Sequence, residues 1–159
     1  MTFQVRPVRD EDRDWVRDTI IERWGDETVV GRGLVSRPHE LDGFIAVERD
    51  VAVGLVTYRI DGDACEIVTI DAFVERRGVG STLVEAVHER AHRAGCARLW
   101  LVTTNDNERA QSLYDKLGFR VAAVRGGAID AARELKPSIP LIGENGVPIT
   151  DEIAFERPL

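Results

Sequence analysis

The segment Glu75-Arg-Arg-Gly-Val-Gly-Ser-Thr-Leu carries the residue types that most directly indicate chemistry. It lies between a predicted strand and a predicted amphipathic helix. Glycines at positions 78 and 80 let a backbone approach a ligand closely, and the free N–H groups of a helix N-terminus favour an anion. The segment therefore indicates a phosphate site, with a helix start that merely needs small residues as the alternative. It is not the dinucleotide fingerprint, because Leu83 occupies the third glycine's place.

A second motif begins at Asn105, after the next predicted strand, and contains Asn107, Ala110, Tyr114, Gly118 and Phe119. Together the two motifs resemble the GNAT superfamily of acyl-CoA-dependent N-acetyltransferases. In that family, (Gln/Arg)-x-x-Gly-x-(Gly/Ala) binds the CoA pyrophosphate and Asn-x-x-Ala-x-x-x-Tyr-x-x-x-Gly-Phe follows. Every spacing of the second pattern is met here. The order of predicted elements is also similar, so the resemblance covers residues 1–125 and the last predicted strand.

The resemblance implies acetyl-CoA as co-substrate and no metal. Backbone groups near Val68 and Ile70 are then expected to pair with the pantetheine arm, where the strand splays from its neighbour at 99–103. A backbone N–H there would polarise the thioester carbonyl as charge develops on its oxygen. The other cofactor-binding positions implied are Arg76, Arg77, Gly78, Val79, Gly80, Ser81, Thr82, Asn107, Ala110 and Tyr114.

Two residues are the candidates for proton transfer in such a reaction. Tyr114 is the predicted acid that protonates the departing CoA thiolate; the alternative is a helical tyrosine packed in the core. Glu66 is the predicted base, acting directly or through water. Strand alternation places Glu66 on the face of Val68 and Ile70, and Asp71 on the opposite face. A solvated carboxylate, or one paired with an arginine, is the alternative interpretation of Glu66.

One position departs from the family pattern, since Glu75 stands where Gln or Arg is usual. A carboxylate beside a pyrophosphate is unfavourable. Arg76 and Arg77 are expected to offset its charge, and the position can act through its backbone. The cofactor site is therefore predicted to be retained.

Two other patterns are weaker. His88-Glu-Arg-Ala-His92 fits the helix-borne zinc signature His-Glu-x-x-His. Neither histidine lies on the apolar face of this helix, and no later histidine completes a metal site. We therefore expect exposed or lightly packed histidines, and the alternative is a zinc peptidase.

Cys65 and Cys96 lack a neighbouring His-Asp constellation, which argues against a covalent acyl-enzyme.

The elements that must position these residues form a mixed α/β pattern. Strands are predicted at 3–5, 44–48, 51–60, 64–73, 97–103, 119–124 and 153–155, and helices at 10–24, 80–94 and 107–117. A loop with a short helix near 27–30 is expected between residues 26 and 42, and a short helix within 126–135. We expect one domain over 1–159: a mostly antiparallel sheet of six or seven strands flanked by helices, with a splay between the fourth and fifth strands.

The chain of 159 residues, with a formal charge of −7, has the size of one domain and too little basic surface for non-specific binding to nucleic acid or anionic membranes. No export signal or membrane-spanning run is visible, and two cysteines form no disulfide framework. These features predict a cytoplasmic protein.

The function predicted from these observations is transfer of an acetyl group from acetyl-CoA to a primary amine, by direct attack in a ternary complex. The acceptor, a small molecule or a peptide, is expected near Trp24, Asp26, Glu27 and the long loop Lys136–Pro148. That loop is expected to cover the acceptor side or to form an oligomer interface, as in a homodimer. A non-catalytic acyl-CoA-binding module of the same fold is the alternative function.

Overall fold

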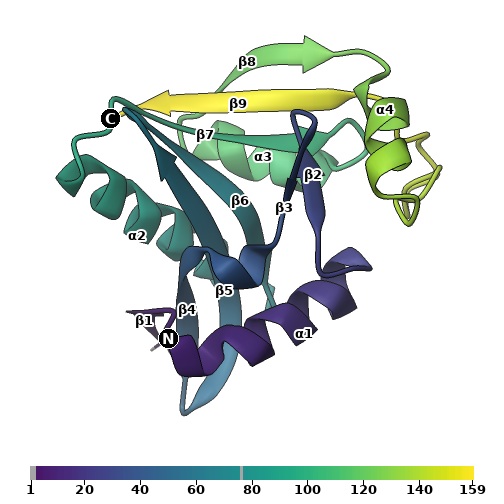
Figure 1. Ribbon diagram of the computed structural model, residues 1–159. Coiled ribbons are helices and arrows are strands. Elements are labelled where there is room, and N and C mark those ends of the chain that lie inside the picture. The colour runs from purple at the N-terminus through teal and green to yellow at the C-terminus, as the bar shows by residue number, and fades with distance from the viewer. Residues whose placement is uncertain (1–2, 76) are drawn as a thin grey trace.

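The computed structural model describes residues 3–75 and 77–159. Its main sheet has seven strands in the order β1-β4-β5-β6-β7-β9-β8, and of the neighbouring pairs only β6 and β7 are parallel (Figure 1). The predicted mixed, mostly antiparallel sheet is thereby confirmed. The strands are β1 (Gln4–Pro7), β4 (Asp42–Glu48), β5 (Val51–Asp61), β6 (Ala64–Ala72), β7 (Arg98–Thr104), β8 (Arg120–Arg125) and β9 (Glu152–Pro158).

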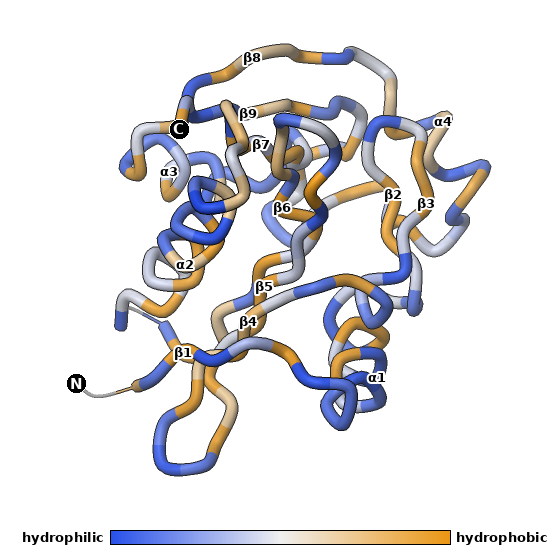
Figure 2. The backbone as a smooth tube through the Cα atoms, turned by 60° about the vertical axis from the view of Figure 1, so that its left-hand side comes forward, coloured by the Kyte–Doolittle hydropathy of each residue, from blue (hydrophilic) through white to orange (hydrophobic). Residues whose placement is uncertain are grey.

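Helices cover both faces of this sheet. α2 (Val79–Arg93) and α3 (Glu108–Lys116) lie on one face, and α1 (Arg13–Trp24) on the other, while α4 (Ala128–Leu135) lies at the end of the sheet beside the β9 start (Figure 1). Apolar residues at helical spacing bury one side of each long helix, which divides the core into two clusters separated by the sheet. Figure 2 shows hydrophobic stretches along the central strands and hydrophilic ones on turns and outer helix faces. No helix of the described residues is long and apolar enough to cross a membrane.

The segment between α1 and β4 differs from its prediction. Instead of a short helix near residues 27–30, it forms a hairpin of β2 (Val29–Gly31) and β3 (Leu34–Ser36). Arg32 and Gly33 have φ angles of 52° and 75°. Two positive φ angles in succession make the tight turn whose twist matches that of paired strands. The apolar pairs that flank Arg32-Gly33 were a hairpin signal that the sequence interpretation missed.

A one-residue bulge in β6 corrects the predicted facing of its side chains. Thr57 pairs with Thr69, but the next residue of β5, Tyr58, pairs with Ile67, so Val68 has no partner across the pair. An extra residue shifts the alternation of all residues beyond it. Ile70 therefore packs with the cluster under α2 and α3, while Val68 packs with the cluster under α1.

Candidate functional site

The site lies where β6 and β7 separate. Their parallel pairing ends at Glu66 and Trp100, and beyond this point the strands diverge, as predicted for the fourth and fifth strands of the sheet (Figure 1). A cavity of about 300 Å³, here called the splay cavity, lies between them. Its walls also include the end of α1 and the start of α3. The lining residues are Arg23, Trp24, 67–71, 101–103, Asn107, Ala110 and Tyr114.

A groove of about 500 Å³, the glycine-loop groove, adjoins the splay cavity and shares Ile70, Asn107, Ala110 and Tyr114 with it. Gly78 caps α2 with a φ of 72°, in the left-handed region that favours glycine. The first intrahelical backbone bond comes from Thr82 N to Gly78 O, at 3.0 Å. The N–H groups at positions 79–81 precede it and lack helical acceptors, as expected of a site for an anion.

The loop residues divide between the groove and the core. Ser81 and Gly80 line the groove. The Val79 side chain is only 1% exposed and packs in the core, so this residue has just its backbone to offer a ligand. The Thr82 hydroxyl donates to Gly78 O at 2.8 Å and steadies the first turn. Arg76 lies outside the described residues.

Glu75 has a counter-charge across the glycine-loop groove. Its Oε1 accepts a hydrogen bond from Arg109 Nη1 of α3 at 2.9 Å, and both residues line the glycine-loop groove. This partner raises the pKa of Arg109. Arg77 forms an ion pair with Glu48 at the end of β4. The sequence analysis assigned the positive charge beside Glu75 to the loop arginines. Arg109, across the groove, also supplies such a charge.

The second motif builds the start of α3 and the wall between the two spaces. Asn107 is the N-cap of α3, and its side chain accepts from Ala110 N at 3.2 Å. Tyr114 is 5% exposed and lines both spaces, with its ring 5.8 Å from that of Phe119 and 5.7 Å from that of Phe155. Burial, with a smaller effect of the Asp71 charge, raises the pKa of Tyr114 and keeps the phenol protonated. The Tyr114 ring is therefore packed in the core, as one interpretation had it, while one side borders the cavity; its role as the acid stays a prediction.

Glu66 lies at the closed end of the splay and lines a third space, the hairpin cavity. It is 9% exposed, and its Oε1 accepts from Arg59 at 2.9 Å. Burial raises the pKa of Glu66, while Arg59 opposes the shift. The carboxylate is thus both paired with an arginine and directed at a cavity. The hairpin cavity is lined by Trp24, 29–31, Ser36, Glu66, Val68, 102–104, Asn107, Ile129 and Glu152.

Asp71 also belongs to the site, contrary to its predicted opposite facing. The β6 bulge turns it toward α1, where its Oδ2 accepts from Trp24 Nε1 at 2.9 Å, and it lines the splay cavity with Tyr114. Burial raises the pKa of Asp71, partly countered by the Trp24 hydrogen bond. Of the three residues expected near the acceptor, Trp24 lines both the splay cavity and the hairpin cavity, whereas Asp26 and Glu27 line neither.

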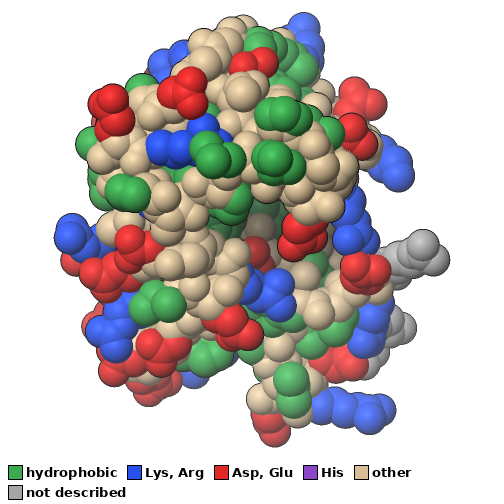
Figure 3. Space-filling model, turned by 90° about the vertical axis from the view of Figure 1, so that its right-hand side faces the viewer, with side chains coloured by type: hydrophobic (Ala, Val, Ile, Leu, Met, Phe, Trp, Pro, Cys, Tyr) green, Lys and Arg blue, Asp and Glu red, His purple; other side chains and the backbone are tan. Residues whose placement is uncertain are grey.

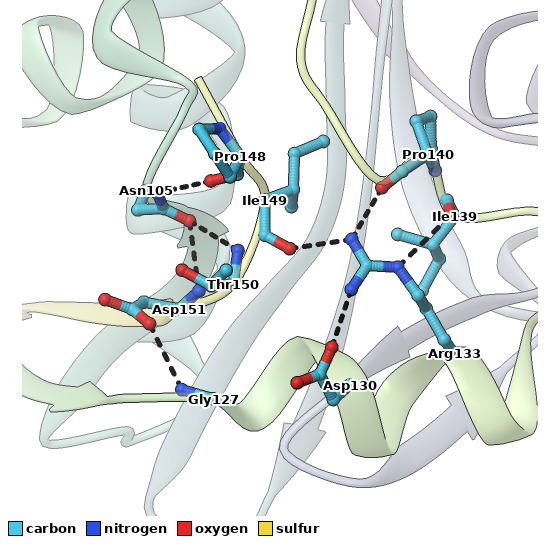
Figure 4. A network of polar contacts seen from close by, with 10 residues as sticks. All are labelled: Asn105, Gly127, Asp130, Arg133, Ile139, Pro140, Pro148, Ile149, Thr150 and Asp151. Atoms are coloured by element: carbon cyan, nitrogen blue, oxygen red, sulfur yellow. Dashed lines mark hydrogen bonds and ion pairs between the residues drawn. The ribbon is translucent and has the colours of Figure 1, made fainter. Parts of the chain in front are cut away.

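The long segment after α4 packs beside these cavities. Lys136 is 5% exposed, and its Nζ donates to Trp24 O at 2.8 Å and Thr28 O at 2.6 Å. Figure 4 shows how two further side chains hold the segment: Arg133 donates to three carbonyls, and Asn105 bonds the backbone of the stretch 148–151 that leads into β9. The carbonyls are those of Ile139, Pro140 and Ile149, and Asn105 contacts Pro148, Thr150 and Asp151.

The remaining candidates lie elsewhere. His88 Nδ1 is 2.6 Å from Arg157 Nη2, and His92 is exposed. The described residues contain no group of three or more His, Cys, Asp or Glu that could hold a metal ion. Cys65 and Cys96 are buried free thiols, and burial raises the pKa of Cys65 to about 12. A thiol so buried is a poor nucleophile near neutral pH.

Comparison with known proteins gives consistent results. A model of the acetyltransferase (GNAT) family matches residues 5–119. The uncharacterized protein YdhI of Bacillus subtilis (strain 168) is 43% identical over 141 residues, which cover 88% of each chain. An IAA acetyltransferase from Bacillus cereus has a similar fold, with a TM-score of 0.74, 18% identity and coverage of 99% of this chain and 100% of that one. A GNAT family acetyltransferase from Elizabethkingia anophelis, solved with acetyl-CoA bound, has a TM-score of 0.69, 20% identity and coverage of 99% and 98%.

Proposed function

Because the chain belongs to the acetyltransferase (GNAT) family, we propose that it transfers the acetyl group of acetyl-CoA to the nitrogen of a primary amine. The observation that carries the proposal is the continuity of the three spaces along the splay. A groove at an open helix N-terminus leads to a cavity bordered by a protonated phenol, and this leads to a cavity with buried carboxylates. The order of these three spaces matches the parts of the reaction: the groove suits a phosphate-bearing donor, the phenol a leaving group that needs a proton, and the carboxylates a basic acceptor.

The glycine-loop groove fits the pyrophosphate of CoA. Its N–H groups are unpaired within the helix, its wall at position 80 has no side chain, and a Cβ placed there would already lie 3.4 Å from Leu113 Cδ2. We assign Gly78, Gly80 and Ser81 to phosphate contact, with Val79 and Thr82 contributing through backbone N–H groups or helix geometry. Arg77, which lines the groove, is proposed to add positive charge there, and Arg76 is assigned the same role from the motif alone. The pantetheine arm then lies against Val68 and Ile70, whose edge of β6 no longer pairs with β7.

The residues around the splay cavity divide the proton transfers. Acetyl-CoA supplies an activated acyl group as a thioester. The amine nitrogen forms a bond to the acyl carbon, the carbon–sulfur bond breaks, and the sulfur takes a proton from Tyr114. Glu66, directly or through one water, receives the proton that the nitrogen loses. Asn107 and Ala110 shape the cavity opposite β6, so both reactants are held in one geometry and no covalent enzyme intermediate is needed.

Two measurements test this proposal in order. Titration calorimetry with acetyl-CoA and with CoA should show binding of both. Incubation with acetyl-CoA and a panel of amines should then release free CoA thiol in proportion to acetylated amine. Binding without thiol release for any amine would contradict an enzyme and favour a non-catalytic acyl-CoA-binding module; absence of binding at millimolar ligand would contradict the cofactor site itself.

A further inference from the structure

The reaction proposed above requires only a primary amine, but the charge and size of the hairpin cavity restrict which primary amines can bind. We propose that the acceptor is a small primary amine with an apolar body and no carboxylate, and that free amino acids and protein N-termini are poor substrates. This inference rests on the proposed function and concerns the same site.

The charge of the cavity walls is one-sided. Glu66 and Glu152 line it, and none of the described residues that line it is Lys or Arg. The arginines that bind these carboxylates, Arg59 and Arg125, contact them from outside the lining. Glu152 is 5% exposed. Burial is the main cause that raises the pKa of Glu66; the Glu152 charge adds a smaller rise, while Arg59 and Arg32 act in the opposite direction. A cationic amine is attracted into such a cavity, whereas a substrate carboxylate meets two like charges in a poorly solvated space.

The size of the cavity restricts the rest of the molecule. Its volume is about 130 Å³, and a cavity of about 150 Å³ is filled by benzene. Much of its wall is apolar, with Val29, Val68, Val102 and Ile129 among the lining residues. An aliphatic or aromatic body of about benzene's size therefore fits, and fills the cavity without leaving room for a peptide chain.

The β2–β3 hairpin closes this cavity on the side away from the glycine loop. Arg32 N at its tip donates to Glu152 Oε2 of β9 at 3.1 Å, and the Arg32 guanidinium lies 5.0 Å from the Trp100 ring centroid. Gly31 lies so close to β7 that a Cβ would be 3.1 Å from Val102 Cγ2. Figure 1 shows the hairpin standing across β6 and β7. A chain that continues from an acetylated N-terminus would have to pass through this closure.

The acceptor reaches the thioester from the other end of the cavity. The hairpin cavity and the splay cavity share Trp24, Val68, Val102, Thr103 and Asn107. The reacting nitrogen is therefore placed at this shared boundary, with its body in the hairpin cavity. Figure 3 looks onto this side of the molecule, where a hollow with both acidic and basic side chains at its rim opens between an upper and a lower part.

A matched series of amines tests the inference. Isopentylamine is leucine without its carboxylate, leucinamide keeps the bulk but removes the negative charge, and a tetrapeptide with N-terminal leucine adds a chain. We expect kcat/KM for isopentylamine to exceed that for leucine by about 100-fold or more, since juxtaposed like charges cost several kcal/mol, with leucinamide between them and the peptide lowest. Equal or better use of leucine or the peptide would overturn the inference and leave the proposed function intact.

Two pairs of variants link the preference to the cavity. Glu152→Gln keeps an oxygen for Arg32 N–H and should reduce the isopentylamine-to-leucine ratio about tenfold, because one of two like charges is removed. Glu156→Gln, on the same strand but outside the cavity, should leave this ratio unchanged.

Val30→Phe should fill the cavity and raise KM for isopentylamine with an unaltered acetyl-CoA Kd. Val35 is the cross-strand partner of Val30 and lies outside the lining, so Val35→Phe should leave this KM unchanged. A ratio unaffected by Glu152→Gln, together with an unaffected KM in Val30→Phe, would contradict the site.

Failure of the enzyme proposal would look different. If acetyl-CoA binds but no amine of the wider panel is acetylated, the proposed function fails and the inference fails with it. If amines of that panel are acetylated but none of these four is, the proposed function stands and the inference alone fails. Acetylation of any of them keeps the proposed function, and the rank order alone then decides the inference.

Discussion

The two sides of the β6–β7 splay are built in different ways. The side that we assign to the cofactor consists of two local units, a loop leading into α2 and the start of α3, whose key contacts join residues a few positions apart, such as Asn107 with Ala110 N. The side that we assign to the acceptor is assembled from distant parts of the chain. Lys136 bonds Trp24 O, and Arg32 N bonds Glu152.

This difference indicates which property each side can vary. A local unit fixes its own geometry and serves one constant ligand, whereas a wall made of a hairpin, a short helix and a strand end can change shape without disturbing the cofactor contacts. Variants on the two sides should therefore separate cofactor binding from acceptor binding and stability.

The largest effect is expected at the boundary between the two sides. Tyr114→Phe removes the proton donor but keeps the ring packed against Phe119 and Phe155. Turnover should fall by about 10²–10⁴, with the acetyl-CoA Kd unchanged by calorimetry. Wild-type turnover, under conditions where chemistry is rate-limiting, would exclude Tyr114 as the acid.

Glu66→Gln should lower kcat/KM by about 10², the low end expected for loss of a general base. In the wild type, kcat/KM should rise with pH as Glu66 loses its proton, with a midpoint above the ordinary value of 4.5 because its pKa is raised. The variant should lack this rise. Asp71→Asn is the control, since the pKa of Asp71 is also raised; loss of the rise in that variant instead would identify Asp71 as the base.

Lys136→Met should destabilise the acceptor side without changing the affinity for acetyl-CoA. Removing the ammonium leaves Trp24 O and Thr28 O without this donor, so the free energy of unfolding should fall by about 2–4 kcal/mol. Urea denaturation measures this change, and calorimetry should give an acetyl-CoA Kd within about twofold of the wild type, as the cofactor contacts are local. Lys116→Met, at an exposed lysine of α3, is the stability control.

Gly80→Asp addresses the cofactor side alone. A carboxylate at this wall of the groove should raise the acetyl-CoA Kd about tenfold or more by repelling the phosphates, with little loss of stability. Gly80→Ala separates charge from bulk, because its Cβ would meet Leu113 at an ordinary contact distance of 3.4 Å. Equal affinities for Gly80→Asp and wild type would place the pyrophosphate elsewhere.

The smallest effect is expected for Arg109→Gln. The Arg109–Glu75 pair is exposed, so its loss should hardly change stability, but the Glu75 carboxylate beside the phosphates would have one counter-charge fewer. We expect a rise in acetyl-CoA Kd of about two- to fivefold. In the double variant with Glu75→Gln, the affinity should return; failure to return would indicate a direct contact of Arg109 with the ligand.

The same contrast explains what the sequence could predict. The glycine loop, Asn107, Ala110 and Tyr114 follow fixed spacings, and the long amphipathic helices follow a 3.6-residue period. The fold, and the position of these motifs at the starts of two helices, could therefore be predicted. The face of the sheet on which Asp71 lies could not be predicted. A single bulged residue at Val68 reverses the alternation of the side chains, and no residue type in the sequence signals this bulge. Glu152 could not be singled out either, since only tertiary contacts bring it to the hairpin tip.

The position of β9 has a consequence for how the protein is made. This strand, the last along the chain, pairs with β7 on one side and β8 on the other. Until residues 152–158 have emerged from the ribosome, β7 and β8 have no strand between them, and both expose unpaired edges of the kind that promote aggregation. Nascent chains can thus form the glycine loop and helix early, but the chamber that we assign to the acceptor closes only as β9 is inserted.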